Sequence, residues 1–228
     1  MKGYDLIIPV FNEKNILKLL DYIFNYAKKF NCIYICYDYE DDLSISIIKK
    51  SKYINSSKIK LIKNLGQGPC EAIKSGINHS LADCLIIYPA DDFNNGKLLD
   101  KMHDLFLKDY EIVCPSRFMK EGIIKNCPFV KLMIVKIVSF ILFYFSNINI
   151  KDPTNGFRLF SKKILKNYKI ESTKGFAYSL ELLVKAKKDK SKIIEIPSTW
   201  IERDDRKSSF KIIRWSKDYL RWFFFAIF

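Results

Sequence analysis

The sequence predicts an α/β fold with a mostly parallel β-sheet and crossover helices. Short apolar runs alternate with segments of helical periodicity through the first half of the chain, and polar residues directly follow several of these runs. Strands that alternate with helices pair in parallel, because each helix carries the chain back across the sheet. The 228 residues, 49% of them hydrophobic, suit one domain with a sizeable core.

The first half contains five expected strands and four expected helices. The strands are the apolar runs at residues 5–10, 32–38, 59–63, 85–88 and 111–117. The helices are expected at residues 12–29, 43–51, 69–79 and 98–107. The first helix shows apolar residues at helical spacing, with Asn12 or Asn15 as its N-cap. Pro69 suits the first turn of the third helix, where no backbone N–H is needed.

The second half changes character at residues 129–145, which read FVKLMIVKIVSFILFYF. A membrane-spanning helix needs roughly 20 apolar residues. Lys131 and Lys136 interrupt this segment, and the charge-free stretch 137–150 has only 14 residues. Basic residues within an aromatic-rich apolar helix suit the boundary between headgroups and acyl chains. We therefore expect an interfacial helix, with a buried core helix as the alternative and a spanning helix disfavoured.

The C-terminal segment 211–228 predicts an amphipathic helix at a membrane surface. It combines basic and aromatic residues, namely Lys211, Arg214, Lys217, Arg221, Trp215, Trp222 and Phe223 to Phe225. This composition is typical of helices that lie in the membrane interface. The alternative is a terminal helix docked on the core. The expected division is a domain at 1–210, with halves 1–118 and 119–210, followed by this helix.

Charge is distributed unevenly between the two halves. Residues 1–118 carry 16 Lys/Arg and 15 Asp/Glu, whereas residues 119–228 carry 23 and 10. The basic second half predicts an anionic partner, which includes a phosphate-bearing substrate, an anionic membrane surface or nucleic acid.

The six cysteines show no paired zinc spacing, so we expect reduced and mostly buried thiols. Residues 1–5 lead directly into a strand without an apolar leader segment. Both observations favour a cytoplasmic protein.

Asp91 and Asp92 end the apolar run that begins at Cys84. Ligands of open α/β sheets bind beyond the carboxyl ends of the strands. Two adjacent carboxylates at such a place favour a divalent metal that carries phosphate oxygens, because a cation offsets the cost of holding them ionised. The alternative is a helix N-cap, a position that Asp also favours.

Six motifs occur in a recognisable order. They are IIPVFNE (7–13), YDYEDD (37–42), NLGQGPCEAIKSGI (64–77), YPADDF (88–93), DPTNGFRLF (152–160) and RDDRKSSF (203–210). Together they resemble family 2 GT-A glycosyltransferases, and most of all the dolichyl-phosphate mannose synthase-like branch. This resemblance implies transfer of a sugar from a nucleotide donor to a polyprenyl phosphate at the cytoplasmic membrane face, with inversion at the anomeric carbon.

The resemblance implies a donor site in the first half. Pro9 fixes φ where its strand leaves the sheet. Asn12 and Glu13 offer polar groups to the base and ribose, and Asp38 can accept a hydrogen bond from the nucleotide. The remaining donor-site residues are Gly66, Gly68, Ala90, Asp91 and Lys207.

The acidic motif implies Mg²⁺ or Mn²⁺, with Asp91 and Asp92 as ligands. Asp91 matches the family's metal-binding acid, whereas Pro89 stands where the family has its first acid. Residues 37–42 also depart from the family's usual Asp-Asp-Gly-Ser run.

The resemblance places Arg117, Asp152 and Arg203 with Asp91 at the reacting centre. An arginine fork can bind two phosphate oxygens at once, although a surface salt bridge is the commoner role for an arginine. Arg203 and Lys207 lie on a late loop, in which Arg206 and Ser209 replace the family's Gly and Lys.

The chemistry depends on the acceptor. A phosphate monoester has a second pKa near ~6 and needs no strong general base. A sugar hydroxyl would require one, and Asp152 or Glu181 would then be the candidates, with a structural ion pair as the other role for Glu181. The alternatives are transfer to a saccharide or another lipid, and a non-catalytic sugar-nucleotide binder. We expect no nucleic-acid partner, because the chain lacks a recognised motif for one.

Overall fold

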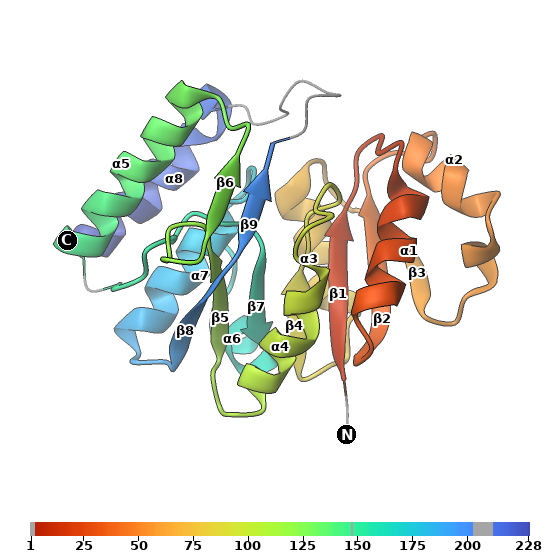
Figure 1. Ribbon diagram of the computed structural model, residues 1–228, viewed down its shortest axis with the longest axis horizontal. Coiled ribbons are helices and arrows are strands. Elements are labelled where there is room, and N and C mark those ends of the chain that lie inside the picture. The colour runs from red at the N-terminus through yellow and green to blue at the C-terminus, as the bar shows by residue number, and fades with distance from the viewer. Residues whose placement is uncertain (1–2, 147, 203–211) are drawn as a thin grey trace.

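A seven-stranded sheet forms the centre of the protein (Figure 1). The computed structural model describes residues 3–146, 148–202 and 212–228, and for residues 212–216 it describes the backbone alone. The strand order is β3-β2-β1-β4-β7-β5-β8. Only β7 runs antiparallel to its neighbours within this described sheet, so the predicted mostly parallel sheet is confirmed.

The strands of this sheet are short. They are β1 (Tyr4–Pro9), β2 (Phe30–Tyr37), β3 (Ile59–Lys63), β4 (Cys84–Ile87), β5 (Ile112–Ser116), β7 (Arg158–Ser161) and β8 (Ile193–Pro197). A separate parallel pair, β6 (Ile123–Lys125) and β9 (Thr199–Ile201), lies beyond the carboxyl ends of β5 and β8.

Helices cover both faces of the sheet. They are α1 (Ile16–Tyr26), α2 (Leu43–Lys49), α3 (Pro69–His79), α4 (Gly96–Phe106), α5 (Phe129–Phe145), α6 (Lys162–Asn167), α7 (Ala177–Lys188) and α8 (Ile212–Ile227), with a 3₁₀ turn at Lys52–Asn55. Alternate strand residues divide the core, because successive side chains point to opposite faces. Leu6 and Ile8 of β1 pack with α1, α2 and α4, whereas Ile7 faces the side of α3.

The first helix begins later than expected. Residues 10–15 form a loop in which Asn12 adopts the left-handed conformation, with φ of 51°. Asn15 occupies the N-cap position of α1, but its side chain makes no capping bond. The predicted cap position is therefore confirmed at Asn15, although without a capping hydrogen bond, and the alternative at Asn12 is wrong because its side chain accepts from Leu43 instead.

Helix α5 has the predicted bounds, yet most of it is exposed. Among its residues only Ser139 and Leu142 are buried. Its large exposed apolar residues are Phe129, Val130, Met133, Ile134, Ile137, Phe140, Tyr144 and Phe145. The alternative of a buried core helix is contradicted by this exposure. In the described part of the chain, no helix combines the length and apolarity needed to cross a bilayer.

Helix α8 packs against α7 and also contacts α5. Helices α5 and α8 run side by side in Figure 1. Trp222 is 2% exposed and belongs to the core between these elements. On the other side of the helix, Leu220, Phe224 and Phe228 are exposed. The helix is thus docked through one face and apolar on another. All six cysteines are free thiols and five are buried, as the sequence predicts.

Candidate active site

The carboxyl ends of β2, β1 and β4 lie next to one another, because these strands are adjacent and parallel. Pro9 ends β1, Asp38 follows β2, and Ala90 and Asp91 follow β4. The sheet therefore brings the predicted donor-site residues of three separate motifs to one edge, where ligands of open α/β sheets bind.

The loop after β1 is fastened to the start of α2. The backbone N–H of Asn12 donates to the carboxylate of Asp42 at 3.0 Å, and the N–H of Leu43 donates to Asn12 Oδ1 at 3.0 Å. Asp42 also caps α2 by accepting from the N–H of Ser44. Glu13 is 2% exposed, and its backbone N–H donates to Ser44 Oγ. These bonds fix the loop and turn Glu13 away from solvent.

A cavity of ≈ 300 Å³ lies between this loop and the segment after β2. It is lined by Phe11, Asn12, Tyr39, Asp41 and Asp42. Phe11 and Tyr39 are 60% and 42% exposed, and aromatic side chains of this kind can stack on a planar ligand. The cavity occupies the place where the donor's base was expected, even though residues 37–42 depart from the family pattern.

Asp38 holds the glycine turn that precedes α3. One carboxylate oxygen accepts from Asn64 Nδ2 and the other from the backbone N–H of Gly68, both at 2.8 Å. Gly68 has φ of 92°, a conformation that residues with a Cβ rarely adopt. Gly66 approaches Glu71 so closely that a Cβ would lie 2.8 Å from Glu71 Cγ. Asp38 and the two glycines thus form one turn, although their motifs are separate in sequence.

The two adjacent acids of the fourth motif have different surroundings. Asp92 Oδ1 accepts from the backbone N–H groups of Asn94 and Asn95, and its Oδ2 accepts from Asn95 Nδ2 at 2.6 Å. Burial raises the pKa of Asp92, although these donors oppose the shift. Both oxygens of Asp92 are committed to the turn before α4. Asn95 holds the N-cap position of that helix, so the N-cap alternative for Asp92 is wrong. Asp91 lies beside it and is partly exposed.

The described residues contain no cluster of three or more His, Cys, Asp or Glu side chains able to enclose a metal. As far as the described residues go, a site built on Asp91 would rely on water and substrate for further ligands. Mg²⁺ is commonly held in this way, by one or two carboxylates together with phosphate oxygens.

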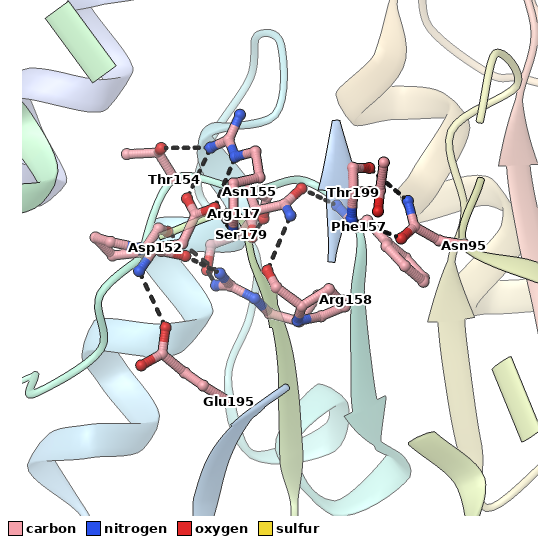
Figure 2. A network of polar contacts seen from close by, with 12 residues as sticks. Asn95, Arg117, Asp152, Thr154, Asn155, Phe157, Arg158, Ser179, Glu195 and Thr199 are labelled. Carbon is pink, nitrogen blue, oxygen red and sulfur yellow. Dashed lines mark hydrogen bonds and ion pairs between the residues drawn. The ribbon is translucent and has the colours of Figure 1, made fainter. Parts of the chain in front are cut away.

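Arg117 and Asp152 form a buried, bidentate ion pair (Figure 2). Arg117 Nε and Nη2 donate to the two oxygens of Asp152 at 2.6 and 2.7 Å, and the backbone N–H of Arg117 donates as well. Burial lowers the pKa of Arg117, but the adjacent carboxylate outweighs this and the net shift is upward. The alternative of a surface salt bridge for Arg117 is therefore wrong, because its ion pair is shielded from solvent. It also leaves Asp152, which is fully buried, without the access that a general base needs.

Arg158 organises the loop at residues 152–157. Its side chain is fully buried and donates to the carbonyls of Ser179, Asp152 and Pro153. Asn155 donates to the carbonyl of Pro115 in β5. Sequence reasoning marked this loop but missed the structural role of Arg158. An arginine between Phe157 and Leu159 in an apolar run is the signal that pointed to burial.

A groove of ≈ 610 Å³ lies between α5 and the segment after β5. It is lined by Arg117, Phe118, Met119, Gly122, Ile124, Lys136, Ser139, Phe140, Phe143, Tyr144 and Lys151. Lys136 and Lys151 are exposed and form no ion pair with any described residue. The groove therefore combines three cations with an aromatic wall.

Glu181 lies on α7, away from solvent. Its carboxylate accepts from the backbone N–H groups of Glu171 and Ser172 and from Lys185 Nζ, all at 2.7 or 2.8 Å. It takes the structural ion-pair role that the sequence left open. Arg203 and Lys207 lie outside the described residues, as do Arg206, Ser209 and Lys211.

A family model described as Glycosyl transferase family 2 matches residues 5–169. The chain belongs to glycosyl transferase family 2. The match confirms the resemblance that the motifs within this range indicated.

Curated relatives agree with the predicted branch of the family. Dolichol-phosphate mannosyltransferase of Pyrococcus furiosus is 26% identical over 211 residues, which cover 90% of this chain and 58% of that protein. The chain thus spans little more than half the length of this relative. Polyprenol monophosphomannose synthase of Mycolicibacterium smegmatis is 20% identical over 92% of this chain and 85% of its own length. Dolichyl-phosphate beta-glucosyltransferase of Saccharomyces cerevisiae is 26% identical over 93% of this chain and 72% of its own length.

Solved structures confirm the fold. Glucosyl-3-phosphoglycerate synthase from Mycobacterium tuberculosis, in complex with Mn²⁺, UDP and glucosyl-3-phosphoglycerate, matches with a TM-score of 0.73. The match covers 99% of this chain and 80% of that chain at 12% identity. The same enzyme in complex with Mg²⁺ and UDP also matches with a TM-score of 0.73, at 12% identity over 99% of this chain and 79% of that chain.

Proposed function

We propose that the protein transfers a sugar from a nucleotide-sugar donor to the phosphate of a polyprenyl phosphate, at the surface of a membrane. The observation that carries this proposal is the groove beside α5. A polyprenyl phosphate is an anion on a long apolar chain, and the groove offers Arg117, Lys136 and Lys151 beside Phe140 and Tyr144. Both aromatic residues also belong to the exposed apolar surface of α5, along which the lipid chain would leave.

The surroundings of the predicted carboxylates favour a phosphate acceptor over a sugar hydroxyl. A hydroxyl needs a general base within hydrogen-bond reach. Asp152 is paired with Arg117, Glu181 is paired with Lys185, and both are fully buried. A phosphate monoester with a second pKa near ~6 is largely dianionic at neutral pH and needs no such base.

In the proposed reaction a phosphate oxygen of the acceptor attacks the anomeric carbon. The new C–O bond forms as the bond to the donor's diphosphate breaks, and the leaving group departs as a nucleoside diphosphate. Attack from the face opposite the leaving group inverts configuration. The groove cations hold the acceptor phosphate against electrostatic repulsion from the donor.

The donor is proposed to lie along the edge formed by the loops after β1, β2 and β4. Its base would stack on Phe11 or Tyr39 in the cavity beside Asn12. Asp91 would hold Mg²⁺ or Mn²⁺ with the donor's diphosphate, and this ion would neutralise charge on the leaving group. The M. tuberculosis relative was solved with UDP and either metal, which supports this assignment.

The membrane surface is proposed to meet α5 and α8. These neighbouring helices expose large apolar residues, including Phe129 and Ile137 on α5 and Phe224 and Phe228 on α8. Exposed apolar area of this kind marks an interaction surface. We propose that the protein acts at the cytoplasmic face of the membrane, because the resemblance to the dolichyl-phosphate mannose synthase-like branch implies that location.

A transfer assay tests the function. Purified protein is incubated with labelled UDP-, GDP-, TDP- and CMP-sugars, Mg²⁺ or Mn²⁺, and anionic vesicles that contain polyprenyl phosphate. We expect label in the lipid fraction with at least one donor. Label only in added oligosaccharides would favour the saccharide acceptor, and no transfer with any donor would favour a non-catalytic binder.

Replacing groove cations tests the acceptor site itself. The double variant Lys136→Gln/Lys151→Gln should raise the KM for polyprenyl phosphate by roughly tenfold, because two cations near a phosphate are lost. The KM for the donor should change little. Lys108→Gln is a matched control, since Lys108 is exposed after α4 and does not line the groove.

A further inference from the structure

The side chain of Asn95 joins the acidic motif to strand β9, which lies 104 residues later in the chain. Asn95 Nδ2 donates to Asp92 Oδ2 at 2.6 Å and to the carbonyl of Thr199 at 2.8 Å. The backbone N–H of Thr199 donates to Asn95 Oδ1 at 2.9 Å. Asn95 is 4% exposed, so these bonds are shielded from water. Figure 2 shows Asn95 and Thr199 facing each other.

Asn95 does not use its side chain as a helix cap. It occupies the N-cap position of α4, where asparagine commonly accepts from the first turn of the helix. Its side chain makes no capping bond there. Both ends of the amide are instead committed to Asp92 and to a distant strand, so the contact is tertiary and spans two parts of the site.

Strand β9 supports the wall of the groove. The residue after Thr199 is Trp200, whose ring centroid lies 4.7 Å from the guanidinium of Arg117 and 4.9 Å from Lys131 Nζ. Lys131 in α5 also pairs with Glu202 at 2.8 Å. β9 pairs with β6, in which Ile124 lines the groove opposite Trp200 in register.

A continuous set of contacts therefore runs from the acidic motif to the groove. Asp91 is adjacent to Asp92, Asp92 binds Asn95, Asn95 binds Thr199, and the next residue packs on Arg117. The Asn95 contact links the part of the site proposed for the donor to the part proposed for the acceptor. We use the term Asn95 link for the bonds of Asn95 with Asp92 and Thr199.

We propose that Asn95 is a positioning residue that sets the acidic motif at a fixed distance from the acceptor groove. This inference rests on the proposed function, because only a transfer between two bound substrates makes that distance matter. Asn95 touches neither substrate in this scheme and acts through Asp91 and Arg117. A displacement of about 1 Å between reacting groups can cost about 100-fold in rate.

The kinetic test uses Asn95→Ala. We expect kcat to fall by about 10- to 100-fold, while the KM for the donor and the KM for polyprenyl phosphate each stay within about twofold. Each half of the site still binds its substrate, but the two are misaligned. Asn94→Ala is the matched control, because Asn94 is an exposed neighbour whose side chain is outside the link. Unchanged kcat in Asn95→Ala would overturn the proposal, as would a loss explained by a smaller folded fraction.

A second variant, Asn95→Asp, keeps the volume and removes the amide donor. The carboxylate has no N–H to donate to Asp92 or to the carbonyl of Thr199. We expect kcat to fall at least as far as in Asn95→Ala, because the volume is kept and only the donated hydrogen bonds are lost. Wild-type kcat in Asn95→Asp would contradict a role for the donated hydrogen bonds.

Fluorine NMR tests the link without turnover. The protein is labelled with 5-fluorotryptophan, and the resonance of Trp200 is assigned with Trp200→Phe. Asn95→Ala should shift or broaden this resonance, whereas Asn94→Ala should leave it in place. An unchanged resonance in Asn95→Ala would overturn the link. A wild-type protein that transfers no sugar would instead overturn the proposed function, and the fluorine result would still decide whether the link exists.

Discussion

At the scale of single residues, the site is built from carboxylates with contrasting surroundings. The carboxylates of Asp152, Glu181 and Asp92 each accept several hydrogen bonds, which hold together loops and helices of the fold. A buried carboxylate needs such donors to remain ionised. Asp91 follows β4 and, like Asp92, is partly exposed. We propose Asp91 as the metal ligand because it matches the metal-binding acid of the family.

We expect Asp91→Asn to reduce transfer at least about 100-fold while the melting temperature stays nearly unchanged, because the amide keeps the volume and loses the anionic metal ligand. The direct measurement is a thermal-shift titration with nucleoside diphosphate and Mn²⁺, which should stabilise wild type by mass action and the variant much less. Asp109→Asn is the control, since Asp109 is exposed with φ of 66°, which asparagine also tolerates. Normal turnover of Asp91→Asn at saturating metal would refute the assignment.

The positions of these residues were predictable from sequence, but their partners were not. Acids and glycines that follow apolar runs must gather at the carboxyl edge of a parallel sheet, so Asp38, Gly68 and Asp91 were placed correctly there. Which groups pair depends on loops that meet only after folding. Arg117 and Asp152 are 35 residues apart, and nothing local indicates that the arginine fork is filled by that carboxylate.

At the scale of elements, helix α8 is fastened to the loop before α7 by polar contacts. Asp218 accepts from the backbone N–H groups of Thr173 and Lys174, and Trp222 Nε1 donates to Ser172 Oγ at 2.9 Å. Arg221 pairs with Glu171 in the same loop. Removing the whole helix would thus expose part of the core, so point substitutions are the sharper way to examine its role.

The Glu171 pairing predicts a pH-dependent contribution to stability. Hydrogen bonds from Lys185 and then Arg221 lower the pKa of Glu171 below its ordinary value of 4.5. A lowered folded-state pKa gives stability that is present above the unfolded value and is lost as the pH falls through the folded value. Because the side chain is 41% exposed, we expect Glu171→Gln to cost only a few tenths of a kcal/mol at pH 7.

Urea unfolding at pH 7 and at pH 3.5 measures this contribution as the difference between wild type and Glu171→Gln. The difference should shrink at the lower pH. Glu121→Gln, at an exposed site without a described ion pair, should show no such change. A difference that is equal at both pH values would mean that the Glu171 pairing contributes nothing to stability.

Elements were predicted unevenly along the chain. Each strand of the first half is an apolar run between polar loops, so its sequence identifies it. In the second half, β6 and β9 have three residues each, and β7 has four that include the buried Arg158. Such short strands carry too little periodicity to be recognised, and their pairing across the sheet defines them. Helix α5 was located from its length and apolarity, but only the structure shows which residues face outward.

At the scale of the whole molecule, charge and apolar surface are concentrated in the second half. The proposed acceptor groove, α5 and α8 all belong to residues 117–228, which carry the whole net charge of +14. The proposed donor site lies in the nearly neutral first half, beside β1, β2 and β4, whereas β5 and β8 lie at the other end of the strand order. This division matches a reaction in which a soluble donor meets an acceptor held in a membrane.

We expect the protein to float with anionic vesicles and to be stripped only in part by high salt. Each basic residue near an acidic bilayer contributes about 1 kcal/mol, which salt screens, whereas burial of apolar side chains in the interface resists salt. Phe224→Ser/Phe228→Ser should therefore weaken flotation most clearly at high salt, and should lower activity on long-chain polyprenyl phosphate more than on a short, water-soluble analogue. Leu81→Ser, at an isolated apolar residue that is 85% exposed after α3, is the matched control and should float normally. Wild-type protein that stays at the bottom of the gradient would exclude a membrane surface on α5 and α8 and favour a soluble acceptor.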